Sequence, residues 1–500
     1  MINKRIFNML GYVLLFLGVS MIFSAIWSYI DNSNDLTSIL NSSLITTIAG
    51  LFLIIITQLQ FLKIYPYITI KDTDKVDLSH KDGYTLVTLS WVMMTIFGSL
   101  PFYLYGGPFE NYIDAFFESI SGLTTTGATI LAFEDYSTIP RGLMFWRSFI
   151  QFIGGIGIIV FSIAILPLMG FGGVQLFRAE VAGPVADKLT PRVKQTATLL
   201  WTIYFGLIII QTIVLMIEGL TFYDSITHSF TTIATAGFST NPNSIGAYQP
   251  IVQYTIILFM IIAASSFSLH YLAIRRGRVE YFKDREFKVY ISLLVLFVFI
   301  FFADNYSKYL FREGVFEEGF RNSLFTATSL LTTTGFTNFD YETWGYTSQT
   351  MIFILFFIGG CAGSTTGAIK IIRTIVVFKF LIRELKKLLH PKGVFNIKIG
   401  SKKIPEEVVS NTLGFYLFYI FIFVFAAFIF ACLGLDFTSS LSVSASAIGN
   451  IGPGLGEIGP SQNWQNIGTP AKLLASFLML LGRLEIFTVM LIFSGGFSKK

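Results

Sequence analysis

The chain has 500 residues, of which 53% are apolar and 13% are charged, whereas about a quarter of the residues of soluble proteins are charged. This composition excludes an ordinary soluble domain and indicates a protein embedded in lipid. The net charge of +5 identifies no partner, because in a membrane protein the side on which Lys and Arg stand is more informative than their sum.

Apolar runs long enough to cross a hydrocarbon core of about 30 Å as helices occur ten times along the chain. They cover residues 11–30, 44–62, 86–105, 145–169, 196–217, 251–274, 289–310, 350–380, 414–433 and 472–493. The first run is too long, and too soon followed by the next, for a cleaved signal peptide, so we expect it to remain. Cys361 and Cys432 stand in apolar runs without a CxxC spacing, and cysteine chemistry therefore does not explain the protein.

Basic residues gather on one side of the predicted membrane. With ten crossings both chain ends lie on the same face, and that face receives 28 of the 35 Lys and Arg. Most of them stand in the stretches 63–81, 178–194, 275–288 and 370–403. Because cytoplasmic loops carry the excess of Lys and Arg, we expect both termini in the cytoplasm.

Four related segments recur along the chain, TTTGAT at 124–129, ATAGFS at 234–239, TTTGFT at 332–337 and GNIGPG at 449–454. Their central glycines are Gly127, Gly237, Gly335 and Gly452. Thirteen positions before each glycine stand the N-cap candidates Asp114, Asp224, Asn322 and Ser439. About nine residues follow each cap, and a helix of that length spans roughly 15 Å, half a bilayer.

Each repeat is therefore predicted as a span, a half-helix entering from outside, a polar loop and a second span. Such re-entrant backbone is tolerated only when it is buried in protein or lines a wet cavity, and four hairpins meet this condition by surrounding one axis. The predicted fold is an all-α polytopic membrane protein with four helix–pore-helix–helix repeats around a central pore plus two N-terminal transmembrane helices. Its parts are residues 1–82 (the two helices and a cytoplasmic linker), 83–193, 194–287, 288–410 (with a broken second helix) and 411–500.

The four loops have the chemistry of a cation pathway. Helix C-termini carry partial negative charge toward the membrane centre, and rings of backbone carbonyls replace the hydration shell of an ion. Glycine permits the required backbone turns, and Thr adds a hydroxyl acceptor. Close packing by small residues is the alternative reading of any single loop, but the fourfold coincidence favours an ion filter. Its predicted residues are Thr125, Thr126, Gly127, Thr235, Ala236, Gly237, Thr333, Thr334, Gly335, Asn450, Ile451 and Gly452.

The loops contain neither a basic residue nor a ring of Asp or Glu. Three acidic residues stand close by, and we expect them to attract cations into an outer vestibule. They are Glu118, Asp135 and Glu457.

The segments SGLTTTGAT, TIATAGFST, SLLTTTGFT and NIGPGLG resemble those of the Trk/Ktr/HKT superfamily of potassium and sodium transporters. The two additional spans before the first repeat make the chain most similar to the TrkH branch, and the resemblance covers residues 83–493. In this family four filter glycines accompany potassium, whereas a serine in the first repeat accompanies sodium in some plant members. The resemblance therefore implies potassium, which the residues alone do not decide.

The run at residues 350–380 is interrupted by GGCAGSTTGAIK, whose four glycines make a poor helix interior. The interpretation is a movable gate beneath the filter, and the alternative is a kink that packs closely. Arg483 lies inside the last apolar run, where an ionisable residue is costly and needs a partner. It is expected to repel cations and to bind loop carbonyls, or alternatively to pair with Glu485; the family has a gating loop and an Arg at these places. The predicted gate residues are Gly359, Gly360, Gly363, Ser364, Thr365, Thr366, Gly367 and Arg483.

The leading hypothesis is potassium uptake, with a sodium or poorly selective monovalent cation transporter as one alternative. An alternating-access solute carrier is another, but it predicts two inverted halves rather than four parallel quarters. An enzyme is not expected, because the four His are scattered and His228 suits packing or hydrogen bonding. No cofactor and no nucleic acid are expected, and the surroundings are membrane lipid. The resemblance implies a homodimer in the cytoplasmic (inner) membrane and a cytosolic, nucleotide-binding TrkA-like subunit.

Overall fold

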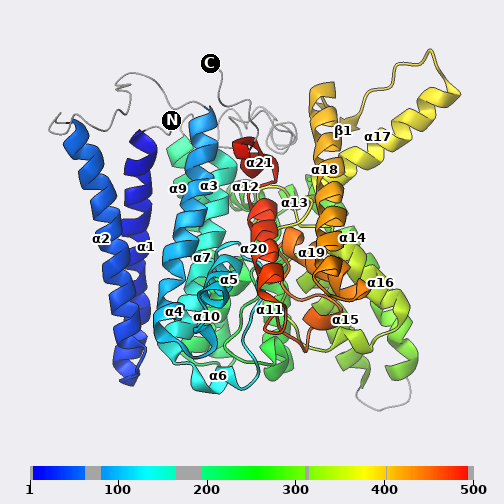
Figure 1. The fold of residues 1–500 in the computed structure, drawn as a ribbon. Coiled ribbons are helices and arrows are strands. Elements are labelled where there is room, and N and C mark those ends of the chain that lie inside the picture. Colours follow the sequence, from blue (N-terminus) through cyan, green and yellow to red (C-terminus); the bar gives the residue numbers. More distant parts are fainter. Residues whose placement is uncertain (1–3, 62–79, 165–192, 310–314, 401, 494–500) are drawn as a thin grey trace.

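The computed structural model describes residues 4–61, 80–164, 193–309, 315–400 and 402–493. The basic stretches predicted at 63–81 and 178–194 lie almost entirely outside these residues. Two long antiparallel helices, α1 (Lys4–Asp31) and α2 (Leu36–Phe61), stand at one side of a larger helical body (Figure 1). Asp35, at the turn between them, accepts a hydrogen bond of 2.9 Å from the backbone of Leu143, and Asp31 pairs with Arg141. These contacts fasten the hairpin to the main body.

The body consists of four repeats of similar layout. The first comprises α3 (His80–Gly98), α4 (Leu100–Tyr105), α5 (Tyr112–Leu123) and α7 (Arg141–Ala164). The second comprises α9 (Val193–Ile217), α10 (Phe222–Ile233), α11 (Pro250–Ala263) and α12 (Phe267–Arg276). The third comprises α14 (Arg285–Tyr309), α15 (Val315–Leu331), α16 (Tyr346–Leu355) and α17 (Ile371–Leu389). The fourth comprises α18 (Glu406–Cys432), α19 (Phe437–Gly449), α20 (Thr469–Arg483) and α21 (Phe487–Phe493).

Short elements complete the described part of the chain. They are η1 (Gly107–Phe109), α6 (Asp135–Thr138), η4 (Ser244–Ala247), α13 (Val279–Lys283), η5 (Tyr341–Thr343), η6 (Gly456–Ile458) and a hairpin of β1 (Lys398–Ile399) with β2 (Lys402–Lys403). The hairpin is antiparallel and pairs Lys398 with Lys403.

Six helices among the described residues are long and apolar enough to cross a membrane, and they match six of the ten predicted runs. Their spans are Arg5–Asp31, Leu36–Gln58, Asp82–Tyr105, Ala197–Ile217, Arg285–Tyr306 and Glu406–Cys432. The run at 251–274, predicted as one span, is bent by 95° between α11 and α12. The run at 472–493 is likewise broken between α20 and α21, where Glu485 and Ile486 adopt positive φ of 55° and 43°. The predicted interruption of the run at 350–380 separates α16 from α17.

We call α5, α10, α15 and α19 the half-helices. The predicted N-caps of α5, α10 and α19 are wrong by one turn, and the predicted cap of α15 is wrong by more. The caps of α5, α10 and α19 are Asn111, Thr221 and Asp436, whose side chains accept backbone N–H groups of the first turn. Asp114, Asp224 and Ser439 stand three residues later, and Asn322 lies inside α15. The half-helices therefore have 12, 12, 17 and 13 residues rather than nine.

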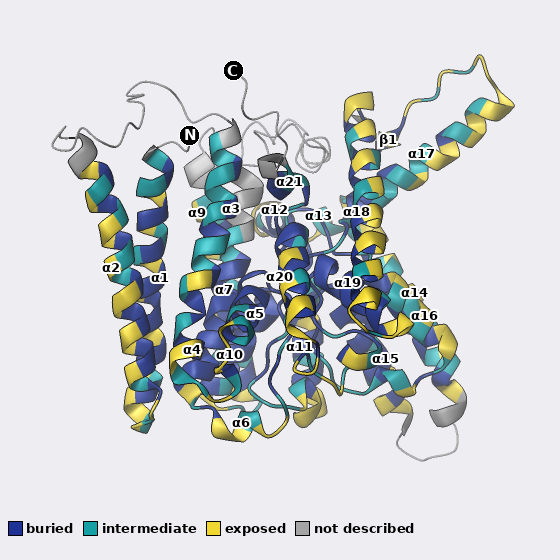
Figure 2. Ribbon diagram, viewed as in Figure 1, coloured by how far each residue is buried: buried dark blue, intermediate teal, exposed yellow. Residues whose placement is uncertain are grey.

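The outer surface is apolar, unlike that of a soluble protein, as expected for a chain in lipid. The outer faces of α1, α2, α9, α14 and α18 expose apolar side chains, whereas the half-helices are buried (Figure 2). Around the half-helices many buried residues are Ser and Thr. The start of α1 and the short α21 lie at the top of the molecule, and α4 and α6 lie at the bottom (Figure 1). The interior of the body thus combines apolar clusters with buried Ser and Thr around the half-helices, and its exterior is apolar.

Candidate ion pathway

Each half-helix leads into a loop with the same backbone conformation. Two residues before each central glycine, a non-glycine residue adopts left-handed φ; these are Thr125 (53°), Thr235 (51°), Thr333 (52°) and Asn450 (53°). The glycines also have positive φ, 79° at Gly127, 80° at Gly237, 77° at Gly335 and 99° at Gly452. L-residues resist this region, so glycine suits these positions. The structure therefore builds one loop conformation four times from different residues.

The same backbone hydrogen bond recurs in all four loops. The residue just before each glycine donates its N–H to the carbonyl five residues earlier, at the end of the half-helix. The pairs are Thr126 to Ser121 (2.9 Å), Ala236 to Thr231 (2.9 Å), Thr334 to Ser329 (2.9 Å) and Ile451 to Ser446 (3.1 Å). These bonds use loop N–H groups, and the Ala236 carbonyl of the second loop additionally accepts a hydrogen bond of 2.7 Å from the Gln151 amide.

The four loops close a ring, which we call the glycine ring. Each glycine lies against a carbonyl of the next loop, so close that a Cβ on the glycine would stand 2.5 Å or less from the oxygen. The pairs are Gly127 with Ala236, Gly237 with Thr334, Gly335 with Ile451, and Gly452 with Thr126. The fourth loop thus returns to the first, and the twelve predicted filter residues lie together around one axis.

Several polar side chains of the ring brace the loops. The Thr126 hydroxyl lies 2.8 Å from that of Thr124 and accepts a hydrogen bond of 3.0 Å from the Asn450 amide. In the third loop the hydroxyls of Thr332 and Thr334 form the equivalent pair at 2.7 Å. These contacts occupy the Thr hydroxyls and hold the loops in position. The backbone carbonyls are then the groups available to bind an ion.

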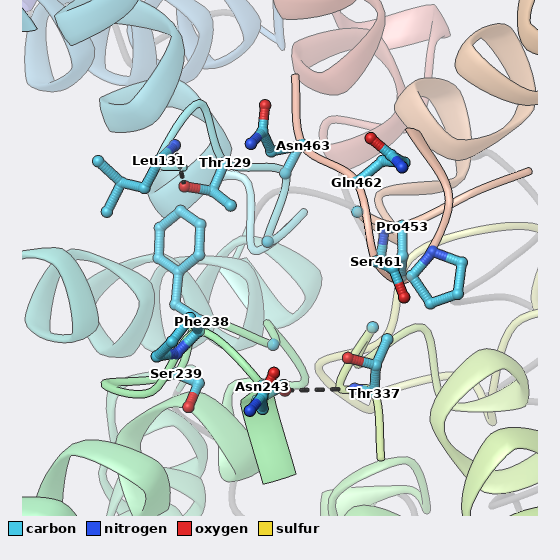
Figure 3. A pocket seen from close by; sticks show the side chains of 18 of the residues that line it. Thr129, Leu131, Phe238, Ser239, Asn243, Thr337, Pro453, Ser461, Gln462 and Asn463 are labelled. Carbon is cyan, nitrogen blue, oxygen red and sulfur yellow. Dashed lines mark hydrogen bonds between the residues drawn. The ribbon is translucent and has the colours of Figure 1, made fainter. Parts of the chain in front are cut away.

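A cavity of about 510 Å³ opens on the side of the ring that faces α6, and all four glycines line it. Side chains from all four repeats surround it (Figure 3); those labelled are Thr129, Leu131, Phe238, Ser239, Asn243, Thr337, Pro453, Ser461, Gln462 and Asn463. Of the described residues that line the cavity, Asp340 provides the carboxylate, and its Oδ2 accepts a hydrogen bond of 2.9 Å from Ser461. The prediction missed Asp340, although it follows the third glycine by only five positions.

The prediction that Glu118 attracts cations in an outer vestibule is wrong, whereas that for Asp135 and Glu457, which are partly or fully exposed but do not line the cavity, stays a prediction. Glu118 is fully buried and forms an ion pair of 2.6 Å with Arg147. It also accepts hydrogen bonds from the Thr129 hydroxyl (2.8 Å) and the Ile130 N–H (3.0 Å). Its charge is thus neutralised inside the protein and supports the first loop.

The interrupted segment, residues 356–370, lies against the ring on the side opposite the cavity. Its Thr365 hydroxyl donates to the carbonyl of Ile233 (3.0 Å), the last residue of α10. The Gly367 N–H donates to the Thr333 hydroxyl (2.7 Å), and the Ala368 N–H donates to the carbonyl of Gly449 (2.9 Å). The segment therefore contacts the second, third and fourth loops or their half-helices.

Close backbone approaches explain the glycines of this segment. A Cβ on Gly359 would stand 2.2 Å from the Gly367 oxygen, and one on Gly367 would stand 2.3 Å from the Gly449 oxygen. Gly360 approaches Ala264 in the same way, and Gly363 adopts φ of 73°. Ser364 and Thr366 are joined by their hydroxyls at 2.9 Å. The predicted gate residues 359–367 thus form one compact loop.

Arg483 is buried beside this loop and donates to the carbonyls of Thr365 (2.7 Å) and Gly154 (3.2 Å). The alternative pairing with Glu485 is wrong, because that carboxylate is paired with Arg373 from α17. Lys370 donates to the Thr366 hydroxyl at 2.7 Å. Lys370 and Arg373, which belong to the basic stretch 370–403, therefore take part in the interior network.

His228 has the hydrogen-bonding role predicted for it. Its Nδ1 lies 2.7 Å from the Asp224 carbonyl, and its Nε2 lies 3.0 Å from the Ser239 hydroxyl. Among the described residues no group of three His, Cys, Asp or Glu is placed to hold a metal ion.

Re-entrant hairpins that close a carbonyl-lined ring within an apolar helical exterior define a pore-forming membrane transport protein. Residues 48–499 match the family model of TrkH, described as a cation transport protein. The chain therefore belongs to the TrkH family of cation transport proteins, which confirms the resemblance seen in the four motifs.

Individual relatives agree with this assignment. The Trk system potassium uptake protein TrkH of Vibrio parahaemolyticus is 39% identical over 428 residues, 85% of this chain and 87% of the relative. The TrkH protein of Escherichia coli K12 is 37% identical over 432 residues, with the same coverage. The crystal structure of the potassium transporter TrkH from Vibrio parahaemolyticus superposes with a TM-score of 0.87 at 33% identity, covering 99% of both chains. The predicted fold class is confirmed.

Proposed function

We propose that this chain takes up potassium across the cytoplasmic membrane through the glycine ring, which acts as the selectivity filter. The observation that carries the proposal is the cyclic contact of four glycines with four neighbouring carbonyls. The relatives named above are potassium uptake proteins, which supports potassium as the transported ion. The filter residues are Thr125, Thr126, Gly127 and their counterparts in the other three loops.

The physical argument for a cation rests on the direction of the backbone dipoles. The half-helices end at the ring, so their C-termini bring partial negative charge to the axis. Carbonyl oxygens replace the water that an entering ion loses. The side chains of the ring residues carry no formal charge, so an ion is bound weakly enough to leave again.

We further propose that the interrupted segment is the gate. It lies against the side of the ring opposite the cavity, and the guanidinium of Arg483 donates a hydrogen bond to its Thr365 carbonyl. A cation leaving the ring meets both the loop and this positive charge. Opening then requires the segment to move aside, and glycines permit such a movement.

Orientation and partners belong to the same proposal. Arg275 and Arg276 are exposed at the end of α12, and further Lys follow at the end of α17. By the excess of positive charge this side faces the cytoplasm, together with both termini. A cytosolic, nucleotide-binding TrkA-like subunit would dock on this basic side, and the membrane part would form a homodimer with one pathway in each chain.

The test is radioactive rubidium uptake into vesicles containing the full chain, with potassium, sodium and lithium as competitors. We expect competition by potassium alone, loss of discrimination against sodium in Gly127→Ser, and no uptake in Gly127→Arg. Gly219→Ser is the matched control, because Gly219 has a φ of 99° but a Cβ there would meet no other atom within 4 Å. Equal competition by sodium in the unchanged protein would assign a sodium or unselective transporter, and unchanged uptake in both Gly127 variants would remove the filter.

A further inference from the structure

Glu286, in the first turn of α14, binds two separate parts of the interrupted segment. Its side chain is 3% exposed. One oxygen, Oε1, accepts hydrogen bonds from the N–H of Ala362 (2.8 Å) and from the N–H of Ile372 (3.0 Å). Ala362 lies in the middle of the segment and Ile372 lies just beyond its end. A single carboxylate therefore joins both limbs of the loop to a different helix.

The bond to Ile372 acts as a cap for α17. Ile372 is the second residue of that helix, and N–H groups in a first turn have no partner within their own helix. The residue at the N-cap position, Lys370, gives α17 no side-chain hydrogen bond. Glu286 supplies the acceptor instead. The start of α17 thus depends on a residue of α14.

Glu286 is also attached to the cytoplasmic bend, which we define as α12, α13 and the first turn of α14. Asp284 accepts the N–H of Phe287 (2.7 Å) at the start of α14, and the Phe287 ring lies 5.1 Å from that of Tyr281 in α13. The Tyr281 hydroxyl in turn lies 2.6 Å from Nδ1 of His270 in α12. These contacts make the bend a packed unit.

The middle of the interrupted segment also contacts the beginning of the bend, where α12 starts. The Phe267 N–H, at the start of α12, donates to the Gly363 carbonyl (3.1 Å). The Cys361 N–H donates to the carbonyl of Ala264, in the break before α12 (2.9 Å). Because the segment is rich in glycine and has little rigidity of its own, these contacts and the Glu286 carboxylate hold its middle against the bend, while its bonds to the loops and to Arg483 hold the part that follows.

We propose that Glu286 is a positioning residue that anchors both limbs of the interrupted segment to the cytoplasmic bend, so that displacement of this exposed basic bend releases the segment. The proposal rests on the proposed function of the segment as the gate. It supplies a mechanical route from the cytoplasmic surface, where a partner would bind Arg275 and Arg276, to the ion pathway. The route requires no change in the glycine ring itself.

The experiment uses the native Cys361 as a reporter, since it lies in the segment and is 1% exposed. The full chain carrying Cys432→Ser, which removes the second of two cysteines, is treated with a water-soluble thiosulfonate, and the rate of Cys361 modification is measured. We expect Glu286→Ala to raise this rate roughly tenfold, because loss of two hydrogen bonds together shifts an equilibrium by about that factor. Glu286→Gln, which keeps a weaker acceptor, is expected to give an intermediate rate.

The matched control is Glu280→Gln, which removes a carboxylate from α13 that pairs with Lys283 (2.8 Å) and is expected to leave the rate unchanged. Modification of Glu286→Ala at the unchanged rate would overturn the anchor; if that variant does not fold, the unchanged rate in Glu286→Gln decides the same way. Rubidium uptake measured in parallel, with Arg483→Ala as the gate reference, separates the two proposals. If Cys361 of Glu286→Ala is modified faster but rubidium uptake rises in neither Glu286→Ala nor Arg483→Ala, the anchoring role of Glu286 stands and the proposal that the segment is the gate is overturned.

Discussion

At the scale of single residues, each loop of the glycine ring contains backbone strain in a defined place. Thr125, Thr235 and Thr333 adopt left-handed φ, which costs about 1 kcal/mol or more for a β-branched residue. Asn450 occupies the same position in the fourth loop, and Asn tolerates this region more readily. The recurrent hydrogen bond from the next residue to the half-helix offsets the cost. If the ring is the filter that we propose, such over-determined strain would hold the carbonyls in place before an ion arrives.

The ring predicts a rank order for glycine substitutions. A Cβ would stand 1.9 Å from the facing carbonyl oxygen at Gly335 but 2.5 Å at Gly452. Gly335→Ala should therefore lower rubidium uptake by roughly tenfold or more, since overpacking costs about 1–3 kcal/mol, and Gly452→Ala should have a smaller effect. Uptake is measured per amount of monodisperse protein. Gly434→Ala, with similar φ of 101° but open surroundings, controls for strain alone, and equal losses in all three variants would contradict the ring geometry.

The residues of the glycine ring were predictable from the sequence because the signal was repeated four times at comparable spacing. The direction of a single carboxylate carries no such signal. Glu118 is acidic and close to the first loop, as a vestibule residue would be, but it pairs with the buried Arg147. Asp340 lies outside the repeated motif yet lines the cavity. Glu286 was also missed, because its partners are backbone N–H groups 76 and 86 positions away.

At the scale of elements, the second helices of the repeats are where the sequence was least informative. The break between α11 and α12 occurs at Ala-Ser-Ser, and that between α20 and α21 occurs in LGRLEIF. Neither contains proline, so apolar periodicity continued through them. Only the glycine-rich interruption in the third repeat had a composition that helices disfavour. The half-helix starts were displaced by one turn because polar residues are favoured both at the N-cap and three residues later.

The corrected cap of α19 makes a prediction about stability. Asp436→Ala should lower the unfolding free energy by about 1 kcal/mol, as is usual for loss of an N-cap side chain. Hydrogen bonding from Ser439 lowers the pKa of Asp436 from its usual value. The contribution of this charge is therefore present above the unfolded pKa, near about 4, and is lost as the pH falls through the lower folded value.

Thermal unfolding in detergent, followed from neutral pH to about pH 3, measures this difference. The gap between the unchanged protein and Asp436→Ala should narrow at the acid end. Thr438→Ala, at an exposed neighbour in the first turn, should have little effect on the unfolding free energy. If Thr438→Ala lowered it as much as Asp436→Ala, the assignment of Asp436 as the N-cap would be wrong.

At the scale of the whole molecule, the sequence indicated the architecture because four similar segments and ten apolar runs constrain one another. A fourfold repeat of re-entrant hairpins has few arrangements in which every buried polar group is satisfied. The mode of attachment of α1 and α2 could not be predicted, since it depends on Asp35 receiving one backbone N–H from α7. Long-range capping of this kind leaves no periodic pattern in the sequence.

The negative charge of Asp340 leads to a prediction that depends on ionic strength. Asp340 lines the cavity next to the glycine ring. In water, a unit charge about 7 Å from a cation contributes about 0.6 kcal/mol. This energy corresponds to roughly a threefold change in the local cation concentration. Asp340→Asn should therefore lower rubidium uptake about threefold at low ionic strength. The Asn oxygen can still accept the Glu342 N–H that Asp340 now accepts at 3.0 Å, so the loop is preserved.

Raising ionic strength with a cation too large to permeate, such as N-methylglucamine, should remove this difference, because charges are screened within about 3 Å at 1 M salt. Glu134→Gln is the control: it neutralises another exposed outer carboxylate that is not among the described residues lining the cavity, and uptake should stay near that of the unchanged protein. A defect in Asp340→Asn that persists at high salt would mean that Asp340 acts through the structure of the loop. A defect that disappears would identify the cavity as the entrance through which the cation approaches the ring.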